Sequence, residues 1–272
     1  MAENIKRFDM VSATDVGRVR PHNEDSIAAD PDIGVATLAD GMGGYNAGEV
    51  ASGIAVAMIP AEMRKLRAAK SVDLMPDAEF EKCVEEQARK VNAAIYTAAQ
   101  KESQYAGMGT TLVFAGWHGS KVTVGHLGDS RMYRVRGDAI DPLTKDHSWI
   151  QEQIDKGLMT YEQARASKKK NLVTRACGID PNVAPEVRTF DVEQGDIYIL
   201  CSDGLYDMVP DDEIHLTVSS LKSNLTLAAQ QLVQQANDNG GRDNISVILV
   251  HVLQGYKQQR AGFLAKLKSW FK

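Results

Sequence analysis

Apolar residues recur along the chain with two periods, and each period predicts a different kind of element. Over residues 77–100 they recur every three or four positions, which is the spacing of an amphipathic helix. A similar pattern predicts a shorter helix over residues 47–58, which Pro60 ends or kinks. Short apolar runs bounded by turn residues predict strands at residues 8–14, 34–39, 111–117, 121–127, 132–136, 184–191, 197–203 and 245–253. Together these elements indicate an α+β domain, in which two packed antiparallel β-sheets form a β-sandwich flanked by helices on both faces.

The composition is that of a soluble protein with a full core, since 43% of the residues are hydrophobic and 25% are charged. The formal net charge of −5 gives no reason to expect a nucleic-acid partner. Cys83, Cys177 and Cys201 lie far apart without a CxxC pair, which argues against a disulfide framework or a zinc site. The N-terminus has no apolar signal segment and no apolar run is long enough to span a membrane, so we expect a cytoplasmic protein.

Carboxylates stand at the ends of several predicted strands. Asp40 and Asp203 each follow an apolar run and precede a glycine, which allows a sharp turn and a close approach to a ligand. Asp-Gly is also common turn chemistry, so one occurrence is weak evidence. The pattern recurs, and the repetition suggests a site for a hard cation. The acids concerned are Glu24, Asp25, Asp40, Asp129, Asp203 and Asp243.

Carboxylates, backbone carbonyls and water suit magnesium or manganese, whereas zinc and copper prefer histidine and cysteine. We expect His118 and His126 to be a turn residue and a strand residue, because neither has a second histidine at metal spacing. Several aspartates converging could hold two cations ~4 Å apart and lower the pKa of a bridging water. A nearby arginine would bind phosphate oxygens bidentately. The sequence has no phosphate-binding Gly-rich loop with Lys-Ser/Thr and no nucleophile elbow, so hydrolysis by metal-activated water is the best-supported chemistry.

The strand pattern is interrupted between residues 145 and 178. A helix is predicted over residues 149–156, and Thr160 and Gln163 have the spacing of a capping box for a second short helix. The basic run at residues 167–170 follows, and the segment has little apolar content. We therefore interpret residues 147–171 or so as a mobile flap over the acidic strand ends, although the lysines could equally be a solvated face.

These motifs, taken in order, resemble those of the type-2C family of metal-dependent serine/threonine protein phosphatases, in its compact bacterial form. The resemblance extends from residue 8 to residue 253 or so and implies a two-metal centre at one end of the sandwich. It assigns residues 1–254 to a catalytic domain and residues 255–272 to a tail. The matching stretches are residues 15–26, 38–44, 107–111, 125–131, 171–178, 200–207 and 241–244.

The resemblance also implies a role for each acid. Asp40 would bridge two tightly bound Mn²⁺ or Mg²⁺ ions, and Gly41 would contribute its carbonyl. Asp203 and Asp243 would complete the shell of one ion. Asp25, and Glu24 through water, would serve the other.

Three further positions matter to the implied mechanism. Asp129 matches the position that holds a third, weaker ion, and Arg20 matches the phosphate-binding arginine. Met42 stands where some relatives have a histidine proposed to protonate the leaving oxygen, so the general acid is unassigned. A metal-bound water held by Asp129 could supply that proton.

The resemblance leaves the physiological role open. The first hypothesis is a phosphatase that acts on phosphoserine and phosphothreonine in proteins and opposes a bacterial Hanks-type kinase. The second is a phosphoprotein-binding module with little turnover, against which the complete set of metal positions argues. The third is a signalling phosphatase with one dedicated client, of the anti-sigma antagonist type, which the catalytic residues cannot separate from the first.

The last eighteen residues form a pattern of their own. Leu264, Leu267 and Phe271 recur at helical spacing, and residues 255–272 contain five basic residues and no acidic one. This pattern predicts a short basic amphipathic helix that docks weakly on an anionic membrane or on a partner. Folding of the apolar face back onto the protein itself is the alternative.

Overall fold

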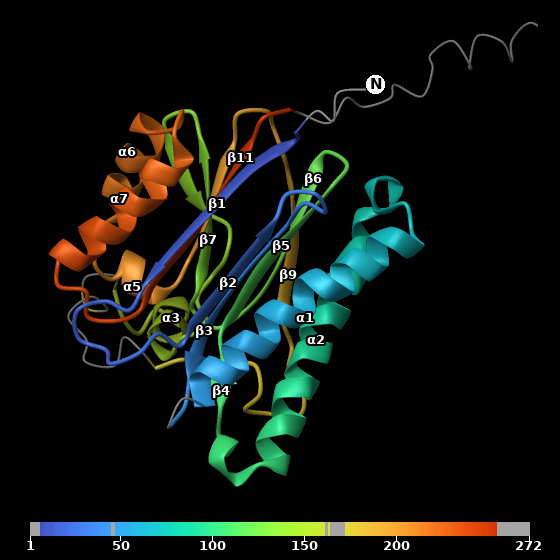
Figure 1. Cartoon of the computed structure of the whole chain (residues 1–272), viewed down its shortest axis with the longest axis vertical. Coiled ribbons are helices and arrows are strands. Elements are labelled where there is room, and N and C mark those ends of the chain that lie inside the picture. Colours follow the sequence, from blue (N-terminus) through green and yellow to red (C-terminus); the bar gives the residue numbers. More distant parts are fainter. Residues whose placement is uncertain (1–5, 45–46, 161–162, 164–171, 255–272) are drawn as a thin grey trace, which may run out of the picture.

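Two antiparallel sheets lie face to face in the middle of the molecule, and helices cover their outer faces (Figure 1). The computed structural model describes residues 6–44, 47–160, 163 and 172–254. The strands are β1 (Phe8–Asp15), β2 (Asp25–Asp30), β3 (Val35–Met42), β4 (Gly109–Thr110), β5 (Leu112–His118), β6 (Lys121–Leu127), β7 (Arg131–Arg136), β8 (Ala139–Pro142), β9 (Glu186–Asp191), β10 (Ile197–Cys201) and β11 (Ile245–Val252). The α-helices are α1 (Ala47–Ala69), α2 (Asp77–Lys101), α3 (Trp149–Asp155), α5 (Asp203–Tyr206), α6 (Asp211–Ser220) and α7 (Leu225–Asp238).

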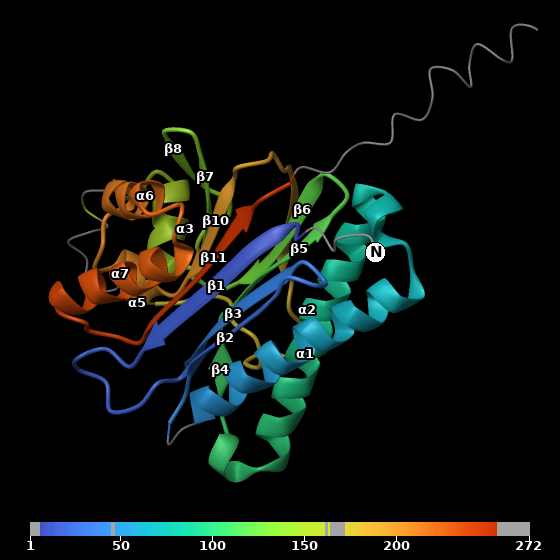
Figure 2. The same ribbon diagram turned by 45° about the horizontal axis from the view of Figure 1, so that its top comes forward.

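The strand order explains how distant parts of the chain meet. One sheet has the order β1-β11-β10-β7-β8, and the other has the order β2-β3-β5-β6-β9, with β4 paired to β3. Figure 2 shows β10 between β7 and β11 in the first sheet. The predicted α+β sandwich is therefore confirmed.

Alternating side chains on each strand supply two different cores, as the two-residue period of a strand requires. On β11, Ile248 and Val250 point between the sheets, whereas Val247 and Leu249 pack toward α6 and α7. The rings of Trp117 and Tyr198 meet edge to face across the sheets, with centroids 5.5 Å apart. The central strands are thus buried on both faces, which explains why β5, β10 and β11 are apolar along most of their length.

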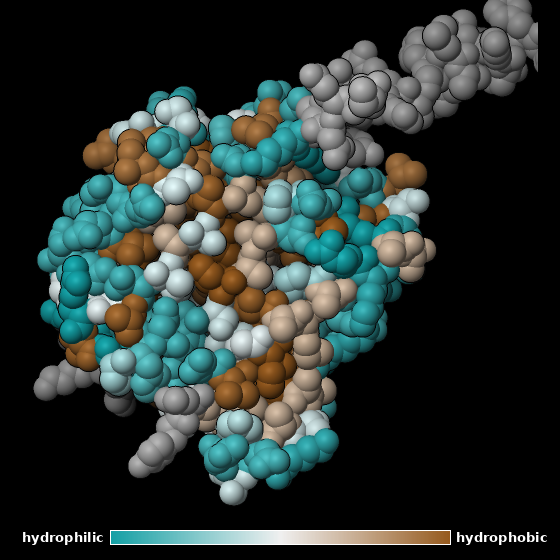
Figure 3. Space-filling view, in the orientation of Figure 1, coloured by the Kyte–Doolittle hydropathy of each residue, from teal (hydrophilic) through white to brown (hydrophobic). Residues whose placement is uncertain are grey.

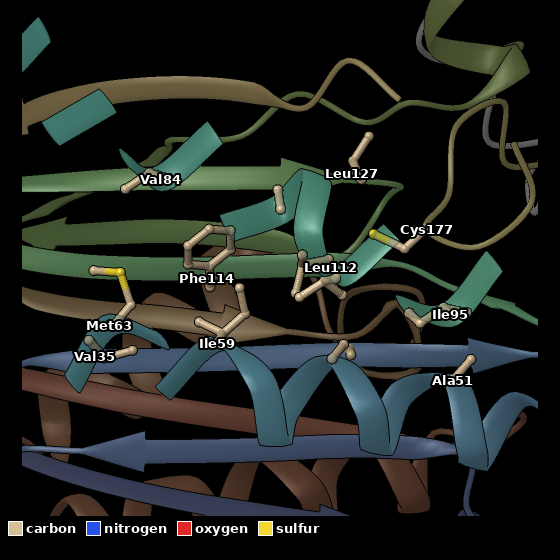
Figure 4. Close-up of a cluster of buried hydrophobic side chains, with 14 of the residues drawn as sticks. Val35, Ala51, Ile59, Met63, Val84, Ile95, Leu112, Phe114, Leu127 and Cys177 are labelled. Atoms are coloured by element: carbon tan, nitrogen blue, oxygen red, sulfur yellow. The ribbon is translucent and has the colours of Figure 1, made fainter. Parts of the chain in front are cut away.

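Helices α1 and α2 cover the six-stranded sheet. Figure 4 shows Ile59 and Met63 of α1 beside Phe114 of β5 in this core. The prediction was that the helix ends or kinks at Pro60. The predicted end is wrong, because α1 continues past Pro60 to Ala69. Burial of Ile59 and Met63 on either side of Pro60 compensates for the backbone hydrogen bond that proline cannot make.

Strands β1 and β2 are end strands of the two sheets and lie side by side, so they form an open β1–β2 edge of the sandwich. Met10 and Ile27 of these strands pack against the core between the sheets and are only partly buried. Figure 3 shows apolar surface in the middle of the face on which these strands lie, with polar residues around it. Among the described residues, no helix combines the length and the apolar character needed to cross a bilayer.

Parts of two predictions fall outside the described residues. Helix α3 at the start of the flap agrees with the prediction. The predicted capping box after it also forms, because the Thr160 N–H donates to Gln163 Oε1 at 2.9 Å and the Gln163 N–H donates to Thr160 Oγ1 at 3.2 Å. Residues 161–162 and 164–171 of the flap, with its lysines, and the tail at residues 255–272 are not described.

Candidate metal centre

Asp25 and Asp40 face each other across the first strand pair of the six-stranded sheet. They are direct partners in the β2–β3 register, so their side chains lie on the same face of the sheet. The Asp40 backbone is fixed on its other side, since its N–H donates to Thr111 Oγ1 at 3.0 Å and its carbonyl accepts from Thr111 N at 2.9 Å. Local strand pairing thus brings two carboxylates together at the end of the sandwich.

The glycine after Asp40 is required for a close approach and not for a turn. Strand β3 continues through Gly41 to Met42, and both residues pair with β4. The sharp turn expected after Asp40 is therefore absent. A Cβ atom on Gly41 would lie 2.2 Å from the carbonyl oxygen of Gly48 in α1. Any side chain at Gly41 would therefore push the helix away from the metal-binding end of the sheet.

The other sheet delivers Asp203 and Asp243 from neighbouring strands. Asp203 begins α5 directly after β10, and Asp243 lies just before β11. A Cβ atom on Gly204 would lie 2.0 Å from the carbonyl oxygen of Asn244, so these two segments are in direct backbone contact. Because β10 and β11 are paired, both carboxylates reach the same end of the molecule as Asp25 and Asp40.

Two polar residues that the sequence did not single out join the sheets at this end. Ser202 Oγ donates to Asp25 Oδ2 at 2.8 Å, which ties β10 to β2. Asn244 Oδ1 accepts from the Glu24 N–H at 2.8 Å, and its Nδ2 donates to the carbonyls of Val16 and His22. Their positions beside Asp203 and Asp243 were visible in the sequence, but nothing there signalled their bonds to residues some 180 to 230 positions away.

Burial and like charge raise the pKa values of Asp25, Asp40 and Asp203 in this centre. Loss of hydration is the largest cause, and it raises the pKa of Asp25 to about 6. It also raises the pKa values of Asp40 and Asp203 well above their ordinary range. For Asp40 the next causes are the charges of Asp25 and Asp203, which shows that the carboxylates of both sheets converge.

The residues present fit a divalent cation. In the described part of the chain, Glu24 Oε1, Asp25 Oδ1 and Asp203 Oδ1 are buried oxygens that accept no hydrogen bond. Buried carboxylate oxygens normally accept hydrogen bonds, so three that accept none, on residues at the same end of the sandwich, call for a positive partner. An oxygen-only set of this kind suits Mg²⁺ or Mn²⁺.

Asp129 and Arg20 stand beside this group. Burial, followed by the charge of Asp146, raises the pKa of Asp129 to about 6. The Asp129 carbonyl accepts from the Tyr206 hydroxyl at 3.0 Å. Arg20 reaches the centre from the β1–β2 loop, and its guanidinium donates to Asp243 Oδ2 at 2.6 Å. Both residues therefore lie at the acidic end of the sandwich.

A second group of potential ligands lies outside the acidic centre. Among the described residues, His126, His147 and Glu186 have ligand atoms that all lie within 4.8 Å of one another, and no three of the acids meet that spacing. His126 is a strand residue, as predicted, and the fold places His147 beside it, a neighbour that the spacing of histidines in the sequence does not reveal. His118 ends strand β5 and is not a turn residue.

A β-sandwich with an oxygen-only acidic centre and an arginine at its rim defines a metal-dependent phosphoester hydrolase. The sequence profile of protein phosphatase 2C matches residues 18–246, so the chain belongs to the protein phosphatase 2C family. Membership confirms the family and the enzyme class expected from the motifs.

Individual relatives agree with this membership over most of the chain. "Serine/threonine phosphatase stp" of Listeria innocua is 38% identical over 242 residues, which cover 87% of this chain and 93% of the relative. "Protein phosphatase PhpP" of Streptococcus pneumoniae is 36% identical over 244 residues, covering 87% and 94%. The crystal structure of Mycobacterium tuberculosis PstP/Ppp superposes with a TM-score of 0.82 at 32% identity, covering 91% of this chain and 99% of that one. A structure of the PstP catalytic domain in complex with two manganese ions superposes with a TM-score of 0.78, at 32% identity and the same coverage.

Proposed function

We propose that the chain hydrolyses phosphoserine and phosphothreonine esters of proteins with Mn²⁺ or Mg²⁺ held in the acidic centre. The observation that carries this proposal is the group of buried carboxylate oxygens without hydrogen bonds on Glu24, Asp25 and Asp203. The names of the relatives and the two manganese ions in the PstP structure support it. Residues 1–254 would form the catalytic domain.

The proposed ligands divide between two tight sites and one weak site. Asp40 would be the shared ligand, and Gly41 would offer its carbonyl. Asp203 and Asp243 would hold one ion, while Asp25, with Glu24 through water, would hold the other. Asp129 would belong to a third, weaker site. Bound divalent ions would supply a lowered pKa for water at this centre, and so a nucleophile near neutral pH.

Arg20 is proposed to bind the phosphate oxygens of the substrate. Its side chain is 52% exposed, so it can exchange its ion pair with Asp243 for one with an incoming phosphate. Met42 carries no proton to donate. Protonation of the leaving oxygen is therefore assigned to a water molecule ordered beside Asp129.

Replacing single carboxylates tests this assignment. We expect Asp40→Asn and Asp203→Asn to fold normally by circular dichroism and to lose at least about a hundredfold in phosphate release from a phosphothreonine peptide. Asp32→Asn is the matched control, because Asp32 is an exposed aspartate in the β2–β3 turn. Wild-type turnover by Asp203→Asn with added Mn²⁺ would contradict the proposal.

The client of the enzyme is a separate proposal. We infer that it opposes a Hanks-type serine/threonine kinase, because the relatives are named serine/threonine phosphatases and such kinases form phosphoserine and phosphothreonine in proteins. A panel of phosphoproteins treated with the enzyme tests this. Comparable rates on several kinase products support the general role, and turnover of one protein alone would favour a dedicated client.

The tail at residues 255–272 lies outside the described residues, and its role is argued from sequence. We propose a cytoplasmic enzyme whose basic amphipathic tail docks weakly on an anionic membrane or a partner. The excess of basic residues on a chain of net charge −5 favours an external acidic surface. The alternative is that the tail covers apolar surface of the protein itself, such as the open β1–β2 edge.

A further inference from the structure

Three side chains form a cluster at the base of the flap, outside the acidic centre. His126 comes from β6, His147 precedes α3, and Glu186 begins β9. The two imidazole rings are stacked, with centroids 4.6 Å apart and planes inclined by 15°. His147 Nε2 lies 3.6 Å from Glu186 Oε2. We call these three residues the histidine cluster.

The hydrogen bonds of the histidine cluster argue against a cation site. The buried Gly128 N–H points at His147 Nδ1 from 3.2 Å, so Nδ1 must carry the lone pair. In the tautomer that accepts from Gly128, the proton sits on Nε2, beside the Glu186 carboxylate, and that nitrogen has no lone pair to offer an ion. An N–H of Arg175 approaches Nε2 to 3.4 Å, and Nε2 could accept it only in the other tautomer. In either tautomer the guanidinium places a positive charge where a cation would bind.

The ring stays neutral in this environment. Burial, followed by the charges of His126 and Arg175, lowers the pKa of His147 to about 4. Nδ1 is thus available as an acceptor throughout the neutral pH range. His126 has a different partner, because its Nε2 lies 2.9 Å from the carbonyl oxygen of Lys145.

His147 forms hydrogen bonds with both backbone groups of Gly128, the N–H and the carbonyl. Its Nδ1 accepts from the Gly128 N–H, and its own N–H donates to the Gly128 carbonyl at 2.9 Å. Gly128 has φ of +103°, and a Cβ atom there would lie 2.7 Å from Thr111. Asp129 follows immediately, so the conformation of Gly128 sets the direction of the Asp129 carboxylate.

The same residue joins both ends of the flap. The Thr174 N–H donates to the His147 carbonyl at 2.8 Å, and the Trp149 N–H donates to the Leu172 carbonyl at 2.9 Å. Ser148 and Val173 form a β-bridge between these bonds. The segment that enters the flap and the segment that leaves it are therefore tied together beside the Asp129 loop.

We propose that His147 is a positioning residue, whose Nδ1 fixes Gly128 and thereby aims Asp129 at the third ion. The proposal rests on the proposed role of Asp129 as a ligand. Within the described part of the chain, the side chain of His147 contacts Gly128, Arg175, Glu186 and His126, and none of the acids assigned to the two tight sites. Its loss should therefore lower kcat and weaken the third ion, while KM and the tight ions stay as they are.

Two polar substitutions of His147 separate positioning from general packing. In His147→Asn the side-chain oxygen occupies the place of Nδ1 and can accept from Gly128, whereas in His147→Gln the oxygen falls near the place of Nε2. Mn²⁺ titration calorimetry on the full chain measures the ions, and a phosphothreonine peptide measures kcat and KM. We expect His147→Gln to lose roughly tenfold in third-ion affinity and in kcat, the effect of one lost buried hydrogen bond, and His147→Asn to stay near wild type.

His147→Leu provides a second variant without an acceptor at this position, should the glutamine variant fold poorly. Equal defects in the asparagine variant and in the variants lacking the acceptor would overturn the proposal, as would loss of the tight ions. Asp129→Ala separates the role of Asp129 in the third site from the positioning role of His147. If Asp129→Ala loses the weak ion while His147→Gln still binds that ion, only the positioning role fails. If both variants still bind the weak ion, the third-ion assignment fails, and the positioning role fails with it. A Zn²⁺ ion bound by wild type, but not by His126→Gln or Glu186→Gln, would also overturn it.

Discussion

Replacing Asp25 by asparagine should stabilise the metal-free protein at neutral pH while it damages the metal centre. Burial raises the pKa of Asp25 from 3.8 to about 6. Between these two pH values the folded state holds a proton that the unfolded state has released, so the free energy of unfolding falls as pH rises. A shift of about two pKa units corresponds to a penalty of about 3 kcal/mol, complete above pH 6 or so. Asparagine avoids the penalty, and its Oδ1 can still accept from Ser202 Oγ.

Thermal melts in a chelating buffer measure this effect. At pH 7 we expect Asp25→Asn to melt roughly 6 °C above wild type, by the usual relation between stability and melting temperature for a chain of this size. At pH 4 the difference should disappear, and added Mn²⁺ should raise the melting temperature of wild type far more than that of the variant. Asp32→Asn, at an exposed position, should match wild type throughout. A variant that melts below wild type at pH 7 in chelator, or a difference independent of pH, would refute this reasoning.

Three further outcomes are expected. Arg20→Ala should raise KM with little change in kcat, whereas Asp129→Ala should lower kcat and keep the tight ions; identical kinetic defects would contradict this division. Gly204→Ala should lower the melting temperature by several degrees and weaken Mn²⁺ binding, because its Cβ would strike backbone, while Gly53→Ala has open space and should do neither. Truncation after Leu253 should leave the melting temperature and small-ester turnover unchanged and abolish binding to anionic vesicles or the partner; a marked loss of stability would show that the tail belongs to the core.

The sequence predicted the acidic centre because its signals are local. Each of Asp40, Asp203 and Asp243 adjoins an apolar strand, and the strand period can be read within a few residues. The sandwich then brings these strand ends together through pairing of β2 with β3 and of β10 with β11.

The features that the sequence did not predict depend on contacts between distant segments. His126 and His147 lie on different elements, and their stacking follows from the path of the chain after β7 and β8. Ser202 and Asn244 acquire their roles from bonds to β2 and its preceding loop. Pro60 does not end α1, because packing of the helix on the sheet outweighs the local preference of proline.

The most direct test of the two-ion centre is a stepwise Mn²⁺ titration of chelator-stripped protein, in which ion binding and phosphate release from a phosphothreonine peptide are followed on the same sample. Because Asp40 is assigned to both tight ions, turnover should stay near zero until the second equivalent binds, and Asp40→Asn should show neither tight binding nor turnover. Full activity in the stripped protein, or tight binding unaffected by Asp40→Asn, would contradict the account.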